Sequence, residues 1–177
     1  VIVDGFEVRN SSGRGISITE SGNVTVRNCN VHDIYGRGIG GSGHDLTIEN
    51  NEVWNCVLMN ENAKNGSAGG WACAVGTWMR TDKSLTKNVI IRNNYVHDNW
   101  GENIDALNAE DGLIQGNIVR DGYSVNIYID TSKRITVDSN YVYSTTNKYN
   151  RPDAGYPAIG IMFASEALLP AYPLDAI

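Results

Sequence analysis

The chain has 177 residues, which is the size of one ordinary domain. Hydrophobic residues make up 41% and charged residues 19%, and the formal net charge is -6 with a pI near 5.0. This composition is too apolar for a disordered chain and too acidic for a typical nucleic-acid binder. No stretch reaches the roughly 18 consecutive apolar residues of a membrane span. We therefore expect no nucleic-acid partner and no membrane insertion.

The residue counts point to many regular turns. The chain has 21 asparagines and 19 glycines but only 4 prolines. Asn and Gly both favour tight turns, because they tolerate backbone conformations that other residues avoid. The excess of Asn is the feature that the fold has to explain.

An internal repeat explains much of the excess of Asn. Five segments align without gaps, and a sixth fits at the N-terminus; in chain order they are 3–10, 26–33, 48–55, 91–98, 114–121 and 137–144. Their spacing is 22 or 23 residues, except that one unit is enlarged to 43. A fixed period of this length indicates a solenoid, in which each repeat buries its apolar face only by stacking on the next one.

Each repeat contains several short segments with alternating apolar residues. A second apolar segment follows the first in every unit, at 15–18, 38–41, 72–75, 103–106, 126–129 and 158–161. Period-two alternation is typical of β-strands, and no helical period appears. The sequence therefore predicts an all-β, right-handed, single-stranded parallel β-helix over residues 1–177, with six to seven coils of about 23 residues and three short strands per coil.

Asn51, Asn94, Asn117 and Asn140 occupy the same position of successive repeats. Coils in such a solenoid are stacked about 4.8 Å apart. An Asn amide can donate to one neighbour and accept from the other, and Asn also tolerates the left-handed turn conformation. We predict an internal ladder of these four side chains, with a structural role.

The recurring N-x-V-x-[DN] at Asn51, Asn94 and Asn117 resembles the β-helix repeat of the pectate-lyase-like superfamily. The resemblance extends over residues 1–165. It implies an extracellular or cell-surface protein that acts on or binds polysaccharide. The superfamily includes polysaccharide lyases, polygalacturonase-like hydrolases and uronan epimerases, together with adhesins that have no catalytic activity.

The two ends carry no recognisable cap. Val1 aligns with Val24 as the first inward residue of a coil, and residues 167–169 align with the start of another one. Open β-helix ends expose unpaired strand edges. We expect an internal piece of a longer solenoid, with end-to-end contacts to further coils.

The three cysteines, Cys29, Cys56 and Cys73, have no metal-ligand spacing. Three unpaired buried thiols are the simplest interpretation, and a single Cys56–Cys73 disulfide is the alternative. We expect no metal site and no cofactor. A calcium ion that bridges the acidic chain to an acidic polysaccharide is possible in principle, but no motif supports it.

Three insertions interrupt the regular coils, at 56–71, 76–87 and 145–157. The first and the last leave from the same turn of the coil and are separated by two regular repeats, so they should stand roughly 14 Å apart. We expect them to form the two walls of a trough. Wall residues include Trp71 and Tyr149.

The floor of this trough is predicted from outward positions in the two regular repeats. The alignment stacks His97 on Arg120, Asp98 on Asp121, Trp100 on Tyr123, Asn103 on Asn126 and Asp105 on Tyr128. Aromatic faces beside amides suit a sugar, so Trp100, Tyr123, Asn103, Asn126, Trp71 and Tyr149 are the candidate carbohydrate-binding residues. Asp98 and Asp121 are expected to accept hydrogen bonds from turn amides instead.

Two kinds of catalysis fit these residues. For β-elimination, His97 or Tyr128 would be the base and Arg120 would stabilise the developing negative charge. For glycoside hydrolysis, Glu102 and Asp105 are the available carboxyl pair, although strand alternation would point them to opposite sides unless Glu102 lies in the turn. A noncatalytic carbohydrate-binding or adhesive module and a structural spacer remain as alternatives.

Overall fold

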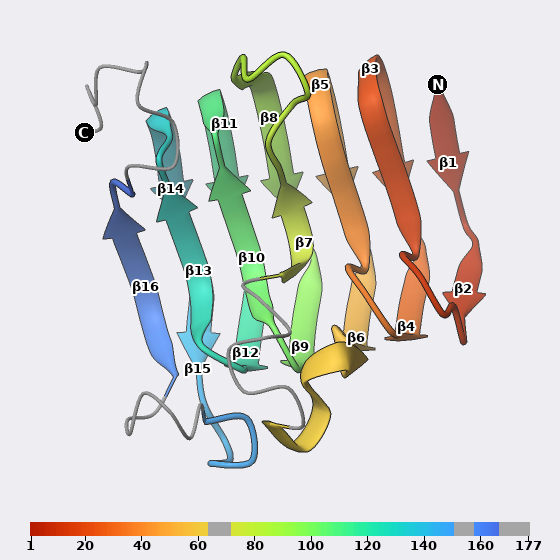
Figure 1. Cartoon of the computed structure of the whole chain (residues 1–177), viewed down its shortest axis with the longest axis vertical. Helices are drawn as coiled ribbons and strands as arrows, with labels where there is room; N and C mark the ends of the chain where they lie inside the picture. The colour runs from red at the N-terminus through yellow and green to blue at the C-terminus, as the bar shows by residue number, and fades with distance from the viewer. Residues whose placement is uncertain (64–71, 151–157, 167–177) are drawn as a thin grey trace.

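The protein is a parallel β-helix whose strands lie side by side from the N-terminal coil at the right of Figure 1 to the last strand at the left. The computed structural model describes residues 1–63, 72–150 and 158–166. All paired strands are parallel and come from successive coils, so the predicted all-β parallel β-helix is confirmed.

The strands form two sheets. The ten-stranded sheet contains β1 (Ile2–Asp4), β3 (Ile16–Arg27), β5 (Ile39–Glu49), β7 (Cys73–Thr77), β8 (Thr86–Arg92), β10 (Glu102–Leu107), β11 (Ala109–Gln115), β13 (Val125–Asp130), β14 (Lys133–Asp138) and β16 (Ile159–Ala164). The six-stranded sheet contains β2 (Glu7–Arg9), β4 (Asn30–Ile34), β6 (Glu52–Cys56), β9 (Tyr95–Asn99), β12 (Ile118–Gly122) and β15 (Tyr141–Tyr143). β3 and β5 are each one continuous strand over a stretch that later coils divide into two strands, such as β7 and β8.

The core lies between the two sheets. The six-stranded sheet contributes a column of buried valines, among them Val53, Val96 and Val119. Facing it, Ile104 and Ile127 lie in register on the ten-stranded sheet. Each apolar side chain thus packs on an equivalent residue one coil away, which is how a repeat too small to bury its own face becomes stable.

Three longer connections join strands of the solenoid. Residues 57–72 lie between β6 and β7, and their described part forms a short 3-10 helix, η1 (Leu58–Ala63). Residues 144–158 lie between β15 and β16, and residues 78–85 between β7 and β8. In Figure 1 η1 and the described part of the β15–β16 connection are at the same end of the strands.

The turns use residues in the left-handed conformation, which accounts for many of the asparagines. Asn50 and Asn93 have φ of 55° and 53°, and Asp98 and Asp121 both have φ of 54°. Asn and Asp are the non-glycine residues that adopt this conformation most readily. One detail differs from the expectation: the left-handed residue at the ladder turn is the one before each ladder Asn, as with Asn93 before Asn94.

The predicted ladder of Asn51, Asn94, Asn117 and Asn140 is confirmed. Each Nδ2 donates to the next Oδ1, at 3.0 Å from Asn51 to Asn94, 3.0 Å from Asn94 to Asn117 and 2.9 Å from Asn117 to Asn140. Each Oδ1 also accepts a backbone N–H of the preceding coil, as from Asn51 N to Asn94 at 3.0 Å. The ladder therefore satisfies amides that the turn would otherwise bury without a partner.

All three cysteines are buried and free, so the alternative of a Cys56–Cys73 disulfide is wrong. Burial raises the pKa of the Cys56 thiol strongly, and it raises that of Cys73 to about 12. Both sulfurs therefore stay protonated and behave as small apolar groups.

Replacing a central ladder residue should cost more than replacing the last one. Asn94→Ala leaves the backbone N–H of Asn51 and the carbonyl of Ile48 without their partners inside the coil. We expect the free energy of unfolding to fall by about 3 kcal/mol, measured by urea denaturation. Asn140→Ala, at the partly exposed end of the ladder, should cost about half as much. Equal losses would contradict a buried ladder that bonds from coil to coil.

Candidate functional site

The predicted site residues are divided between two sheets. His97 in β9 and Arg120 in β12 belong to the six-stranded sheet, whereas Glu102 and Asp105 in β10 and Tyr128 in β13 belong to the ten-stranded sheet. The turn at 99–101 separates the two groups along the chain. The structure therefore pairs these residues into two clusters rather than one trough.

In the first cluster, His97 and Arg120 are in register as predicted. The His97 ring nitrogens lie 2.6 Å from Asp98 and 3.2 Å from Glu52. The guanidinium of Arg120 is held by Asp98 at 2.7 Å and by Asp121 at 2.6 Å, and it donates to Tyr95 Oη at 2.8 Å. These contacts leave little of either side chain free to act on a ligand.

Rings stack along the same face. His32 lies on Trp54 with centroids 4.1 Å apart, and Tyr95 lies on His97 at 3.9 Å. Asp121 accepts the backbone N–H of Thr145 at 2.7 Å, which is the structural role expected for it. The face is a set of mutually satisfied side chains that covers the six-stranded sheet.

The predicted aromatic floor is a closed cluster. Trp100, Tyr123 and Tyr149 are all buried. The Tyr149 ring is 4.9 Å from that of Trp100, and the Lys148 ammonium lies 5.4 Å from the centroid of Trp100. These rings pack on one another at the β9–β10 turn. Trp71, the other predicted wall aromatic, lies outside the described residues.

Asn103 and Asn126 are inside the solenoid, so the expectation that they face outward is wrong. Both are fully buried. Asn99 Nδ2 donates to Asn103 Oδ1 at 2.8 Å, and Asn103 Nδ2 donates to Asn126 Oδ1 at 2.8 Å. They form a second ladder at the turn into β10 and β13, because that turn has the same unpaired amides as the first. The 23-residue spacing of Asn103 and Asn126, equal to the coil period, is the sequence signal that could have indicated this second ladder.

The second cluster lies on the outer face of β7, β10 and β13. Asp105 points away from the core because its neighbours Ile104 and Ala106 point into it. It is in register with Gly76 in β7 and with Tyr128 in β13. Glu102, at the first position of β10, faces the same side and pairs with Cys73. The turn therefore brings the two carboxyls together, whereas simple strand alternation would point them to opposite sides of the sheet.

Glu102 and Asp105 form a buried carboxyl pair. Each residue is only 2% exposed. No donor among the described residues reaches either oxygen of Glu102 or Oδ1 of Asp105. Their contact is with each other, and it is a hydrogen bond only when one of them holds a proton.

Burial is the main cause of their unusual ionisation. It raises the pKa of Glu102 to about 8, helped by the negative charge of Asp130 and opposed by Arg37. The pKa of Asp105 is raised well above its usual range by burial, by Glu102 and by Asp130. The pair therefore holds at least one proton at neutral pH.

A third carboxyl completes the cluster. Asp130 lies two residues after Tyr128 on the same face of β13, and its Oδ1 accepts a hydrogen bond from Thr131 Oγ1 at 2.7 Å. Burial raises the pKa of Asp130 to about 6. Tyr128 Oη donates to Glu166 at 2.8 Å, and burial raises the pKa of Tyr128 strongly. Asp130 is thus ionised at neutral pH while Tyr128 keeps its proton.

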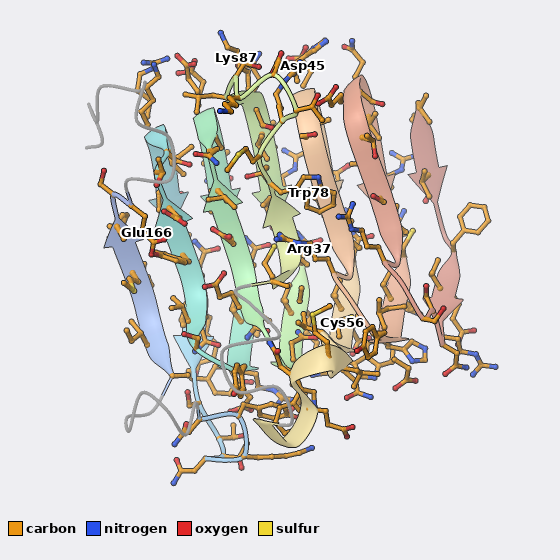
Figure 2. The ribbon with its side chains drawn as sticks, in the orientation of Figure 1. Arg37, Asp45, Cys56, Trp78, Lys87 and Glu166 are labelled. Atoms are coloured by element: carbon orange, nitrogen blue, oxygen red, sulfur yellow. The ribbon has the colours of Figure 1, made fainter. Side chains whose placement is uncertain are left out.

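Two cations and an aromatic ring lie at the other end of this face. Arg37 Nη1 donates to Cys73 Sγ at 3.3 Å, and its guanidinium lies 5.2 Å from the centroid of Trp78. Arg14 reaches the same ring at 4.9 Å. Figure 2 shows Arg37 and Trp78 near each other over β5 and β7, with Glu166 near the end of β16.

Comparison with known proteins agrees with this architecture. The family described as the right handed beta helix region matches residues 1–67 and 57–167. The chain belongs to this family. No curated protein matches the chain. A solved structure, the crystal structure of the Dettilon tailspike protein, is similar with a TM-score of 0.58 and 16% sequence identity. The similarity covers 94% of this chain and 38% of the tailspike chain, so this chain spans well under half the length of that protein.

Sequence reasoning missed Arg37, Trp78, Asp130 and Glu166 in this cluster. Two of them had a usable signal. Arg14 and Arg37 are one repeat apart, and Asp130 continues the outward alternation that Tyr128 begins. Trp78 and Glu166 lie just beyond the ends of β7 and β16, where alternation stops being informative.

In the described ranges, no group of three or more His, Cys, Asp and Glu side chains is arranged to hold a metal ion. Among the described residues, no helix is long and apolar enough to cross a membrane.

The buried carboxyl pair should make stability depend on pH. The native pKa of Glu102 is raised, so stability present below the unfolded pKa of about 4.5 is lost as the pH rises toward 8. Glu102→Gln has no charge to bury. We expect this variant to exceed the parent protein in unfolding free energy by about 2–4 kcal/mol at pH 8 and by little at pH 4.

Chemical denaturation at several pH values measures this difference. Glu7→Gln, at an exposed carboxylate of β2, is the matched control and should shift stability by less than about 0.5 kcal/mol. A Glu102→Gln variant whose advantage is the same at pH 4 and pH 8 would show that this carboxyl is not held protonated.

Proposed function

We propose that this β-helix is an extracellular glycoside hydrolase that cleaves a polysaccharide on the outer face of β7, β10 and β13. The observation that carries the proposal is the buried Glu102–Asp105 pair, in which no donor among the described residues reaches either oxygen of Glu102 or Oδ1 of Asp105 and which holds a proton at neutral pH. A folded protein gains no stability from such a pair, because the charged forms lose hydration and find no donor. Perturbed carboxyls that weaken a fold are typical of catalytic sites.

The roles follow from the protonation states. The Glu102–Asp105 pair donates its proton to the glycosidic oxygen as the bond from that oxygen to the anomeric carbon breaks. Asp130, ionised above a pKa of about 6, takes a proton from water, whose oxygen attacks the anomeric carbon. One water is consumed, and the proton on Asp130 returns through solvent to the pair.

The spacing favours inversion over retention. The Asp105 and Glu102 carboxyls contact each other, so they are too close to take two separate roles. Tyr128 is the residue of the next coil that pairs with Asp105. Asp130 lies two residues further along that strand. Strand geometry puts about 8 Å between the Cα positions of Asp105 and Asp130. Inverting hydrolases need carboxyls separated by roughly 6.5–9.5 Å, because a water must fit between them.

The carboxyl pair is closed to solvent, so cleavage there requires the atoms that cover it to move aside when a glycan binds. Such opening is common in enzymes, and a dry site strengthens the electrostatic interactions within it. Arg37 and Trp78 are partly exposed beside the pair and form the approach to it.

Elimination by His97 and Arg120 is less well supported. Both ring nitrogens of His97 and most of the guanidinium of Arg120 are engaged by side chains of the six-stranded sheet. Tyr128 holds its proton too tightly to be a base at neutral pH. The similar solved structure is titled as a tailspike protein, and this likeness in fold supports the proposed extracellular location.

Hydrolysis can be tested by release of new reducing ends from a panel of polysaccharides. We expect Glu102→Gln, Asp105→Asn and Asp130→Asn each to lower the rate at least about 100-fold while the fold persists. The dependence of kcat/KM on pH should be bell-shaped, with limbs near 6 and 8, because Asp130 must be ionised and the pair protonated.

Asp138→Asn, at an exposed carboxylate of β14, is the matched control and should leave the rate unchanged. Products with a new carbon–carbon double bond would contradict hydrolysis and indicate elimination. Binding without any turnover would instead indicate a noncatalytic carbohydrate-binding module.

A further inference from the structure

An outward column of residues runs along the solenoid axis at the start of the second strand of each coil. Backbone bonds from Gly15 N to Arg37 O and from Ile16 N to Gly38 O place Arg14 beside Arg37 in the next coil. Ile39 pairs with Val75, which places Arg37 beside Cys73, and Cys73 pairs with Glu102. The column therefore reads Arg14, Arg37, Cys73, Glu102 in successive coils.

The two arginines of this column form no ion pair with a carboxylate among the described residues, although the charge of Arg37 lowers the pKa of the nearby Glu102. Every other arginine in those ranges has one: Arg9 with Glu7, Arg27 with Asp4, Arg80 with Asp82, Arg92 with Glu49, Arg120 with Asp98, and Arg134 with Asp111. Placing two guanidiniums in adjacent coils is unfavourable unless an anion lies between or above them. Because the other described arginines all form ion pairs, the lack of one at Arg14 and Arg37 indicates a different role for these two residues.

Trp78 fixes the position of both cations. The two guanidinium carbons lie 4.9 and 5.2 Å from its ring centroid, within the range of cation–π attraction. Arg14 is exposed and Arg37 is partly exposed, so their remaining N–H groups are open to a ligand. A planar guanidinium offers paired N–H groups that match a carboxylate.

Two glycines lie beside the column, in β5 and β7, and both are buried. Gly40 and Gly76 pair with each other across β5 and β7, and Gly76 pairs with Asp105 in β10. A Cβ at Gly40 would lie 1.9 Å from the carbonyl oxygen of Gly76, and one at Gly76 would lie 2.0 Å from that of Asp105. Only glycine fits at these two positions, so neither residue places a side chain between the arginines and Asp105.

We propose that Arg14, Arg37 and Trp78 form a subsite for a carboxylate-bearing sugar, so that the polymer bound here is an acidic polysaccharide lying along the solenoid axis. This inference rests on the proposed function for what happens at Glu102, but its binding step is independent of cleavage. An acidic chain with a net charge of -6 would otherwise repel such a polymer, and these two cations, which form no ion pair with a carboxylate in the described ranges, supply the local attraction.

Affinity electrophoresis of the whole chain tests the subsite. The gels contain alginate, hyaluronate or polysialate, each compared with its carboxyl-reduced form, which has the same backbone without the charge. We expect retardation by at least one acidic polymer and none by its reduced form. Arg14→Gln and Arg37→Gln should each weaken that binding about tenfold. Arg14→Lys should restore only part of it, since an ammonium lacks the paired N–H groups.

Arg92→Gln is the control, because Arg92 is an exposed arginine already paired with Glu49 at 2.7 Å. It should leave binding unchanged. The inference is overturned if the reduced polymers bind as well as the acidic ones, if no acidic polymer binds, or if Arg14→Gln has no effect. Equal retardation by dextran sulfate and loss of that binding in Arg92→Gln would also overturn it, by showing general ion exchange.

Glu102→Gln separates this inference from the proposed function. This variant should keep the binding of the acidic polymer and lose its hydrolysis. If the parent protein binds the polymer through Arg14 and Arg37 without cleaving it, the subsite stands and the hydrolase proposal fails.

Discussion

Hydrogen bonding between successive coils in one fixed register is the constraint on which this structure depends. Because β10 pairs with β13 residue by residue, each side chain has the equivalent residues of the neighbouring coils about 4.8 Å away. The molecule is therefore a set of columns, and the chemistry of each column decides whether it stabilises the fold. Columns of Val and Ile bury apolar surface, and columns of Asn bond to themselves.

The outer face of β7, β10 and β13 departs from this rule. The inward ladders consist of like residues that satisfy one another, as Asn94 and Asn117 do. The outward column instead changes from Arg37 to Cys73 to Glu102 in three coils, and the next column changes from Gly76 to Asp105 to Tyr128. No repeating interaction stabilises such a series. These mixed columns lower the stability of the fold on the outer face of β7, β10 and β13. The proposed binding and cleavage of an acidic glycan is the function that would explain why they are kept.

The fold could be predicted from the sequence because its signals repeat. The 23-residue period, the inward Val of each N-x-V-x-[DN] unit and the ladder of Asn51 and Asn94 recur in several coils, so that errors in one repeat are corrected by the others. Whether two of the cysteines form a disulfide, by contrast, depends on the positions of single residues, which no repeat reveals.

The site could be predicted only in part. Glu102 and Asp105 were candidates, but their contact depends on how the turn before β10 rotates one residue, which period-two alternation does not describe. The same turn places Asn103 inward. Arg37 and Trp78 come together across 41 residues of sequence through the packing of an inserted loop on an earlier coil. Contacts of this kind have no local pattern.

The protonation state of the Glu102–Asp105 pair is the most direct test of this account. Carboxyl carbon NMR of the ¹³C-labelled protein measures it, with the two resonances assigned from Glu102→Gln and Asp105→Asn spectra. The account predicts that at least one of the two carboxyls is still protonated at pH 7 and that the pair loses its first proton near pH 8. Two carboxylates that both titrate below pH 5 would contradict it, and would leave the outer face of β10 without a proton donor.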